Sequence, residues 1–424
     1  MRNILHLGLV MTILLAVVNC GGNDNPPPDP PKPTITITVT PQPASIPAVG
    51  GAQTLTVATN ATDWSVSSDA SWLTATKINA TSAKIEAAAN SSANRNTVVR
   101  FSTGVATATA TVNVSQGQVS AMQSDSLALV DLYNAAAGNS WTRRWTLTTP
   151  VNQWQGVTIT SNRVTELKLS ANNITGTLPE SFGNLTALQY CDLSKNSLND
   201  IVPASINRLT QLEYLDLSDN SLAGTCPAVN TLTKLLVFDI SFNGFTALPA
   251  LNSLTALEYL AFSKNNITGS LPDNLSALTK LIYLDASFNN FSGNIPSTWS
   301  SLNKMRVLYL YKNLLGGAIP AYITSFTALE SLAFDGNNLT GNIPNDLGNL
   351  PKLAELWLSQ NRLTGAIPNS LLNNSYWSAW QNDVCPQQSS FGFSNCSGTT
   401  SLPALQSAEI PCRAKEFKDR YRKN

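Results

Sequence analysis

The sequence predicts a multidomain chain, in which a small all-β immunoglobulin-like sandwich precedes an α/β solenoid with a curved, parallel concave sheet. Residues 34–118 alternate Thr or Ser with apolar residues, which is the period-two signal of strands. Residues 164–372 repeat one segment about nine times at a period near 24. Stretches rich in aromatic residues flank the repeats, where a solenoid needs caps to cover its two open ends.

The first residues read as a signal peptide over 1–19, because Arg2 precedes an apolar run from Ile4 to Val18. The end of this run, VVNC, resembles a bacterial lipoprotein processing site, in which Cys20 becomes the acylated first residue. That resemblance implies a lipid anchor in the cell outer membrane, on a chain exposed at the surface. A periplasmic position and an unanchored secreted protein are the alternatives. Residues 20–33 hold the anchor and a proline run that favours an extended spacer.

The segment 34–118 carries DWSVSSDASWLTA with Trp64 and Trp72, AANSSANR with Asn90 and Arg95, and a closing VNVSQ at Gln116. These motifs resemble the BACON domain, a module of exported Bacteroidetes proteins. The resemblance implies a carbohydrate-associated domain, and a spacer role is the alternative. We expect the two tryptophans to pack in the core, because a small sandwich needs large apolar residues.

Residues 119–163 are expected to cap the first repeat. A helix is predicted from Ser126 to Ala137, with its apolar face at Leu127, Val130, Leu132 and Tyr133. Three tryptophans and a Gly-Val pair follow, an order that resembles the N-terminal cap of plant-type leucine-rich repeat proteins. The tryptophans, which we expect to pack, are Trp141, Trp145 and Trp154.

The repeats of residues 164–372 share the frame LxxLxLxxN, and most are followed by G-x-[IL]-P. This pattern resembles the plant-type leucine-rich repeat. The first, fourth and sixth positions are apolar, so each short strand buries its face only against neighbouring repeats. The frames end at Asn172, Asn196, Asn220, Asn243, Asn265, Asn289, Asn313, Asn337 and Asn361.

Two kinds of residue within this frame have a predicted structural role. The ninth-position Asn is expected to turn inward and bond the backbone of the next turn, where coil would leave polar groups unpaired. Cys191 and Cys226 fall at inward positions, so we expect buried apolar side chains and not reactive thiols.

The outward strand positions predict a ligand site in the last repeats. Tyr309 and Trp357 stand two strands apart across Ala333, so about 10 Å would separate them. Aromatic faces beside polar side chains suit a sugar ring or a protein hot spot. The polar residues expected around this slot are Lys312, Asp335, Glu355 and Gln360.

Further candidates on the same face are Asp285, Tyr311, Phe242 and Phe288. The two phenylalanines favour a protein ligand, because contiguous apolar surface marks interaction sites. The alternative is that the large residues only shield the end of the sheet.

Residues 373–424 are expected to form a C-terminal cap and a basic tail. Cys385 and Cys396 suit a disulfide that closes a short loop in an exported protein, which leaves Cys412 over. The final CRAKEFKDRYRKN has six basic and two acidic residues, and no function is assigned to it.

Composition argues against nucleic-acid binding and catalysis. Basic and acidic residues are equal at 26 each, so no charge surplus favours a nucleic-acid partner. The single histidine, His6, lies in the predicted signal peptide, which excludes His-based catalysis and leaves no metal or cofactor site to propose. We therefore expect a non-catalytic surface protein that presents its concave face to a protein or glycan. A carbohydrate-binding accessory lipoprotein of a polysaccharide-utilisation system and a passive scaffold are the alternatives.

Overall fold

The chain consists of two compact units, residues 1–118 and 119–424. The computed structural model describes residues 32–90, 92–104, 108–388, 392–396 and 418–420. The predicted signal peptide, Cys20, nearly all of the spacer and Cys412 lie outside these residues. Among the described helices, none has the length and apolar character needed to cross a membrane.

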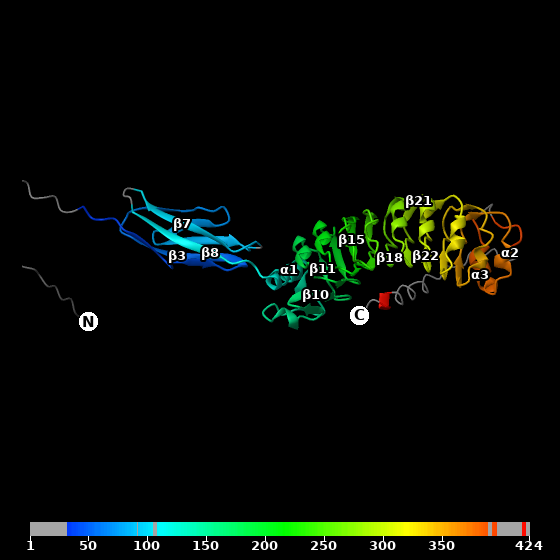
Figure 1. Ribbon diagram of the computed structural model, residues 1–424, viewed down its shortest axis with the longest axis horizontal. Helices are drawn as coiled ribbons and strands as arrows, with labels where there is room; N and C mark the ends of the chain where they lie inside the picture. The colour runs from blue at the N-terminus through cyan, green and yellow to red at the C-terminus, as the bar shows by residue number, and fades with distance from the viewer. Residues whose placement is uncertain (1–31, 91, 105–107, 389–391, 397–417, 421–424) are drawn as a thin grey trace, which may run out of the picture. The chain divides into compact units, whose positions relative to one another are not determined.

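The first unit holds two four-stranded sheets that share one hydrophobic core (Figure 1). Neighbouring strands are antiparallel except for one parallel pair, β2 with β8. Alternate residues along the strands are buried, as the period-two pattern predicts; Leu55, Ile85 and Phe101 are fully buried. The immunoglobulin-like class stays a prediction. The first sheet contains, in order, β1 (Ile37–Thr40), β3 (Gly50–Thr59), β6 (Ser82–Ala88) and β5 (Thr74–Asn79), and the second β2 (Ala44–Ile46), β8 (Thr109–Gln116), β7 (Arg95–Thr103) and β4 (Trp64–Ser68).

The motif residues of this unit are used in its own packing. Trp64 is buried against Phe101, with ring centroids 5.8 Å apart. The Arg95 guanidinium lies 4.3 Å from the Trp72 ring centroid and donates two hydrogen bonds, of 3.0 and 2.7 Å, to Gln116 Oε1. Trp64 therefore packs in the core as expected, whereas Trp72 is half-buried against it.

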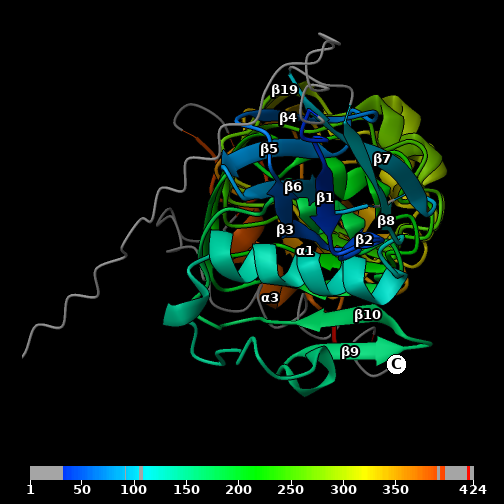
Figure 2. The same cartoon turned by 90° about the vertical axis from the view of Figure 1, so that its left-hand side faces the viewer.

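The second unit begins with the cap helix α1 (Ala121–Ala135), which lies beside the first repeat strand (Figure 2). Ser120 and Gln123 form a capping box, so the helix starts several residues before the predicted Ser126. Its buried side chains include Asp125, Leu129 and Leu132. The predicted face was wrong at Leu127, which is exposed because it lies on the other side of the helix from the buried stripe of Leu129 and Leu132.

The three cap tryptophans pack together, as predicted. Trp145 stacks on Trp154 at 4.9 Å and meets the edge of Trp141 at 4.8 Å. Each indole N–H donates to a backbone carbonyl, so burial leaves none of these donors unpaired. The cluster closes the first end of the repeat core.

The repeats build one ten-stranded sheet, which runs along one side of the unit in Figure 1. Nine strands are parallel and in one-to-one register, and β9 pairs antiparallel with β10 at the cap. Inward Leu, Phe and Cys side chains from all repeats form the main core. The strands are β9 (Val157–Thr160), β10 (Arg163–Lys168), β12 (Tyr190–Asp192), β14 (Tyr214–Asp216), β16 (Val237–Asp239), β18 (Tyr259–Ala261), β20 (Tyr283–Asp285), β22 (Val307–Tyr309), β24 (Ser331–Ala333) and β26 (Glu355–Trp357).

The ninth-position asparagines form a ladder through the core. Asn196 Nδ2 donates to the Leu169 carbonyl of the preceding repeat and to the Leu193 carbonyl of its own, both at about 3 Å. Its Oδ1 accepts from the Ile174 N–H at 3.0 Å. The inward turn was predicted correctly, but the bonded neighbour is the preceding repeat and not the next one.

The opposite side of the unit carries short strands and single 3-10 turns. A proline precedes most of these turns; Pro272 and Pro296 are examples. The glycine of G-x-[IL]-P takes positive φ, 92° at Gly269 and 75° at Gly293, where a side chain would be strained. The strands are β11 (Thr175–Gly176), β13 (Ser197–Asp200), β15 (Ser221–Thr225), β17 (Gly244–Ala247), β19 (Thr268–Ser270), β21 (Asn290–Asn294), β23 (Leu314–Gly316), β25 (Thr340–Gly341) and β27 (Arg362–Leu363). The turns are η3 (Glu180–Asn184), η4 (Ala204–Arg208), η5 (Asp273–Ala277), η6 (Ser297–Ser301), η7 (Ala321–Ser325) and η8 (Leu347–Asn349), and the cap adds η1 (Gly138–Ser140) and η2 (Val151–Gln153).

Two helices, α2 (Asn369–Leu372) and α3 (Trp377–Val384), follow the last repeat. The Asp383 carbonyl accepts the N–H groups of Leu358 and Ser359, so the exposed edge of the sheet is partly paired. Cys385 and Cys396 are joined in a disulfide, the pairing expected from the sequence. These contacts close the second end of the core.

Cys191 and Cys226 are free and buried, as expected for inward positions. Burial raises the pKa of both thiols, that of Cys226 to about 12. Both side chains are therefore protonated and unreactive at neutral pH.

Candidate functional site

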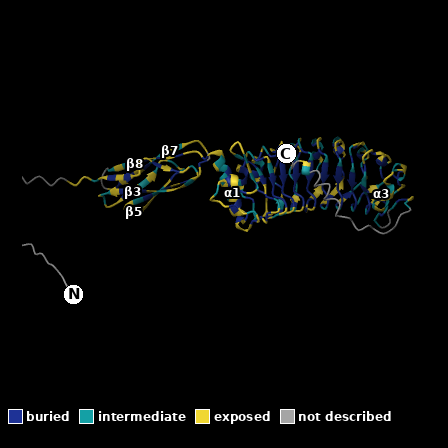
Figure 3. Cartoon of the chain, turned by 90° about the horizontal axis from the view of Figure 1, so that it is seen from below, coloured by how far each residue is buried: buried dark blue, intermediate teal, exposed yellow. Residues whose placement is uncertain are grey.

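The candidate site lies on the outer face of the ten-stranded sheet, which we call the concave face. Figure 3 shows these strands side by side, coloured largely as buried residues. The register places Tyr309, Ala333 and Trp357 in one row across β22, β24 and β26, as predicted. Third-position tyrosines form stacked pairs, Tyr190 with Tyr214 at 4.2 Å and Tyr259 with Tyr283 at 4.3 Å, next to this row.

The slot predicted between Tyr309 and Trp357 is not open in this structure. Ala333, its expected floor, is only 1% exposed, and Tyr309 is equally buried. Tyr309 packs edge to face with Tyr283 and Tyr311, each with ring centroids 6.1 Å away, and accepts a 2.9 Å hydrogen bond from Ser331 Oγ. The rings belong to a second hydrophobic cluster on the concave face, separate from the repeat core.

Two of the polar residues predicted around the slot, Lys312 and Gln360, come together. Lys312 crosses over Gly336, and its Nζ donates to Gln360 Oε1 at 2.9 Å. Both side chains line a hollow of about 410 Å³ at the edge of the face. Glu355 and Trp357 are half-buried on β26. Ligand binding by these residues stays a prediction.

Two predicted carboxyl groups are deeply buried. Asp285 Oδ1 accepts from the backbone N–H and the hydroxyl of Ser287, at 3.0 and 2.5 Å. Burial raises the pKa of Asp285 and of Asp335 to about 6, although hydrogen bonds oppose the rise in each case. Because both carboxyl groups are buried, their hydrogen bonds stabilise the concave face and little of their surface is accessible to a ligand.

The eighth-position phenylalanines are more accessible. Phe242 is 44% exposed, and Phe288 is half-buried against Tyr311 at 5.2 Å. Lys264 Nζ lies between them, 4.2 Å from the Phe242 ring centroid and 5.2 Å from that of Phe288. Phe242 is the most exposed aromatic residue of the predicted site, and Lys264 lies between it and Phe288.

The middle of the concave face holds an arrangement that the sequence did not reveal. Lys418 Nζ lies 2.8 Å from Asp216 Oδ2 and forms a second ion pair with Asp239 Oδ2. Tyr214 and Tyr259 donate 3.2 Å hydrogen bonds to the same two oxygens. Asp216 and Asp239 came from a row common to this repeat pattern, so their row alone gave only a weak signal.

The pKa of each charged group in this arrangement depends on the charges of the other two. Burial disfavours the Lys418 ammonium, but the carboxylates of Asp239 and Asp216 outweigh it and raise its pKa. Burial also opposes ionisation of Asp216, yet the ammonium and the Ser218 hydrogen bonds hold its pKa below the usual range. Burial raises the pKa of Asp239, with Lys418 partly offsetting the rise.

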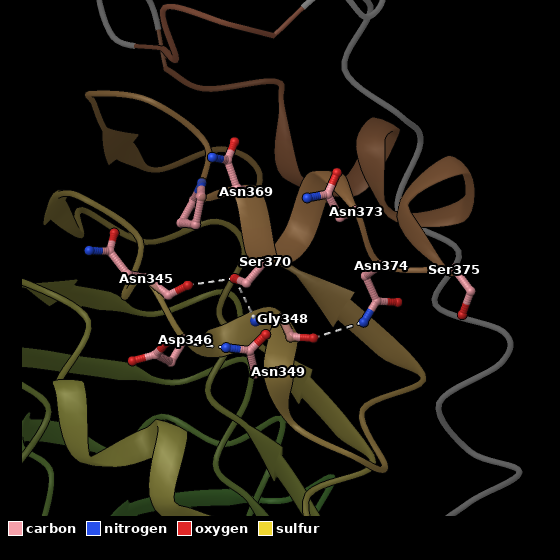
Figure 4. A pocket seen from close by; sticks show the side chains of 10 residues that line it. Asn345, Asp346, Gly348, Asn349, Asn369, Ser370, Asn373, Asn374 and Ser375 are labelled. Carbon is pink, nitrogen blue, oxygen red and sulfur yellow. Dashed lines mark hydrogen bonds between the residues drawn. The ribbon is translucent and has the colours of Figure 1, made fainter.

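A larger hollow, of about 770 Å³, lies away from the concave face between η8 and α2 (Figure 4). Asparagines dominate its lining, but several polar groups are already paired. Ser370 Oγ accepts from the Gly348 N–H at 3.2 Å, and Asn374 Nδ2 donates to the Gly348 carbonyl at 2.8 Å. Among the described residues that line it, none carries an aromatic ring on which a sugar could stack.

Among the residues that the structure describes, no group of three or more His, Cys, Asp or Glu side chains is placed to hold a metal ion. The concave face presents aromatic rings, a lysine and paired carboxylates.

Comparisons with known proteins agree with the repeat architecture. The chain is similar to the ectodomain of the plant membrane receptor kinase GASSHO1/SCHENGEN3 from Arabidopsis thaliana, solved in complex with CASPARIAN STRIP INTEGRITY FACTOR 2. The identity is 29% and the TM-score 0.54, over 62% of this chain and 32% of that one. A plant ice-binding protein matches at 28% identity and a TM-score of 0.51, over 59% of this chain and 83% of that one.

The chain thus spans about a third of the length of the receptor ectodomain. No match was found among curated proteins. A family model described as Leucine-rich repeat region matches residues 164–419, more than half of the chain. With the ten-stranded sheet and the asparagine ladder, this match shows that the chain belongs to the leucine-rich repeat region family.

Proposed function

We propose that this protein is a non-catalytic recognition protein whose concave face binds a protein ligand. The observation that carries the proposal is the accessible aromatic surface of the concave face. Phe242 is 44% exposed, and Phe288 and Trp357 are half-buried against the second hydrophobic cluster, whose five tyrosines are less than 6% exposed. The repeats bury their own apolar residues on the other side of the strands. Accessible aromatic rings outside that core are residues that protein interfaces use as anchors.

The similarity to a receptor ectodomain supports this proposal, since that protein was solved in complex with a named factor. The accessible Phe242 and half-buried Phe288 favour a protein over a glycan, because exposed apolar rings mark protein interaction sites. A glycan ligand, as in an accessory lipoprotein of polysaccharide utilisation, is an outcome of the binding test below. A passive scaffold is another.

We also propose that Cys20 carries a lipid anchor that holds the protein at the surface of the outer membrane. The apolar run before Cys20 and the VVNC end support this proposal. Metabolic labelling with a fatty-acid analogue should label the wild-type chain and leave Cys20→Ser unlabelled. An unlabelled wild-type chain would refute the anchor.

The binding proposal is tested by capture of ligands from extracellular extracts and on a glycan array. The full chain is compared with Phe242→Ala and Trp357→Ala, which truncate accessible rings on the concave face. Ile201→Ala is the matched control, because this side chain is 59% exposed and directly follows β13 on the opposite side. Truncating a central aromatic anchor should weaken retention about tenfold or more.

A protein whose retention falls with the concave variants and not with the control supports the proposal. Glycans that show this pattern, with no protein ligand, would redirect it to carbohydrate binding. Retention that is unaffected by the concave variants would indicate a scaffold.

A further inference from the structure

Lys418 places its side chain in the middle of the concave face, where it contacts Asp216, a residue 202 positions earlier in the sequence. Lys418, the first of the three described residues 418–420, is only 12% exposed in its side chain. Its ammonium contacts Asp216 Oδ2 on β14 and Asp239 Oδ2 on β16. It also lies 5.7 Å from the centroid of the Tyr259 ring, which is within reach of a cation–π contact.

The two carboxylates are prepared for a single cation. Asp216 Oδ1 is occupied by the N–H and hydroxyl of Ser218, at 3.0 and 2.5 Å, and Asp239 Oδ1 by the Ser241 N–H, at 2.8 Å. Each carboxylate therefore presents one oxygen, Oδ2, to the concave face. Two buried carboxylates on neighbouring strands repel each other unless a cation lies between them, so the site favours occupation.

The geometry selects an ammonium over other cations. A guanidinium binds best to both oxygens of one carboxylate, but serine groups already take the Oδ1 atoms of Asp216 and Asp239. Ca²⁺ and Mg²⁺ prefer six or more oxygen ligands, and the described residues supply two carboxylate oxygens with two tyrosine hydroxyls here. An ammonium has three donors, which suit the separate Oδ2 atoms.

We propose that Asp216, Asp239, Tyr214 and Tyr259 form a binding site for a lysine ammonium, which Lys418 of the same chain occupies and which a lysine-bearing segment of the protein ligand takes over. The proposal rests on the recognition function proposed above and names the chemistry of one contact. The C-terminal segment is then an internal competitor that a ligand must displace, so its release sets the apparent affinity.

Occupation by Lys418 is tested by limited acetylation of the full chain with acetic anhydride, followed by peptide mass spectrometry. Lys280, which is exposed in the turn that follows η5, serves as the internal reference. Lys418 should react about tenfold more slowly than Lys280, because burial and ion pairing deplete the free amine. The double variant Asp216→Asn/Asp239→Asn should remove this protection, and Asp219→Asn, an exposed carboxylate of the same repeat, should keep it. Equal rates for Lys418 and Lys280 in the wild-type chain would overturn the proposal.

Takeover by an external lysine is tested with a labelled synthetic peptide of residues 413–424 and fluorescence anisotropy. The full chain with Lys418→Ala should bind the peptide about tenfold more tightly than the wild-type chain, because its site is vacant. A peptide with Lys418→Gln should lose the binding, and Lys418→Arg should regain only part of it. Equal binding of the Lys and Gln peptides would overturn the ammonium site, even if the double variant proved unfolded by circular dichroism.

The two proposals fail in different ways. If the protein recognises no external ligand, capture experiments give nothing, but Lys418 remains protected and the peptide still binds the Lys418→Ala chain. If the lysine site is wrong, protection and peptide discrimination are absent, whereas capture by Phe242 and Trp357 is unaffected.

Discussion

Replacement of one ladder asparagine should show how much these side chains stabilise the solenoid. Asn289 is 7% exposed, and its Nδ2 donates to the carbonyls of Phe262, Ala286 and Ser287 at 2.9–3.3 Å. Its Oδ1 accepts the Ile267 N–H at 3.0 Å. Asn289→Ala removes both sets of contacts and leaves the Ile267 N–H buried without its acceptor.

The expected loss is about 3 kcal/mol of unfolding free energy. Loss of the hydrogen bonds donated by the two Nδ2 protons accounts for about 1 kcal/mol each. Leaving the Ile267 N–H buried without an acceptor costs about 1 kcal/mol more. Urea unfolding followed by circular dichroism and tryptophan fluorescence measures the change. Coincident transitions would justify a single free energy, which long repeat arrays do not always permit.

The neighbouring Asn290 is the matched control, because it is exposed and no hydrogen bond of its side chain is part of the ladder. Asn290→Ala should change the unfolding free energy by less than about 0.5 kcal/mol. If both substitutions cost the same small amount, the ladder would not stabilise the repeats as we describe.

Two further predictions concern buried charges. Asp125→Ala breaks the buried pair with Arg163, in which Nε and Oδ2 are 2.8 Å apart, and should cost about 3 kcal/mol in urea unfolding. Asp131→Ala, exposed on the same helix, should cost almost nothing, and equal effects would refute a specific role for the pair. Because folding raises the pKa of Asp285 and Asp335 to about 6, the folded state keeps protons that the unfolded state loses, so these groups lower stability as pH rises from 4 to 6. Asp285→Asn should reduce this dependence by about 2 kcal/mol between unfolding curves at pH 4 and pH 6, and an unchanged dependence would contradict the assignment.

The repeat architecture could be predicted because each repeat poses the same packing problem. Leucines at fixed spacing and an inward asparagine leave few alternatives, so the sheet and its register followed from the sequence. The direction of the asparagine bonds did not, because a side chain between two turns can reach either one. The cap helix shows a similar limit: Ser120 and Gln123 set a start before the predicted one, and the buried stripe through Leu129 and Leu132 leaves Leu127 exposed.

The candidate site was predicted less completely. Periodicity assigned Tyr309 and Trp357 to one row, but it carries no information on how closely outward side chains pack above the sheet. Ala333 looked like a gap because alanine is small, whereas neighbouring tyrosines fold into one cluster. An open slot requires accessible surface, which a row assignment cannot supply.

The lysine site escaped prediction for a different reason. Lys418 lies 202 residues from Asp216 in the sequence, so no local pattern links them. The available signal was charge complementarity between a basic tail and a row that carries Asp192, Asp216, Asp239 and Asp285. Such complementarity indicates that the two segments can attract each other, but it does not identify which residues form the contact.

The central claim, that the concave face is the binding surface, is tested most directly by hydroxyl-radical footprinting of the full chain with its captured ligand. Phe242 and Trp357 should lose reactivity when the ligand is bound, because an interface excludes water from its aromatic anchors. Ile201, which is exposed next to β13 on the opposite side, should react at the same rate with and without ligand. Protection of Ile201 with unchanged reactivity of Phe242 and Trp357 would contradict the account.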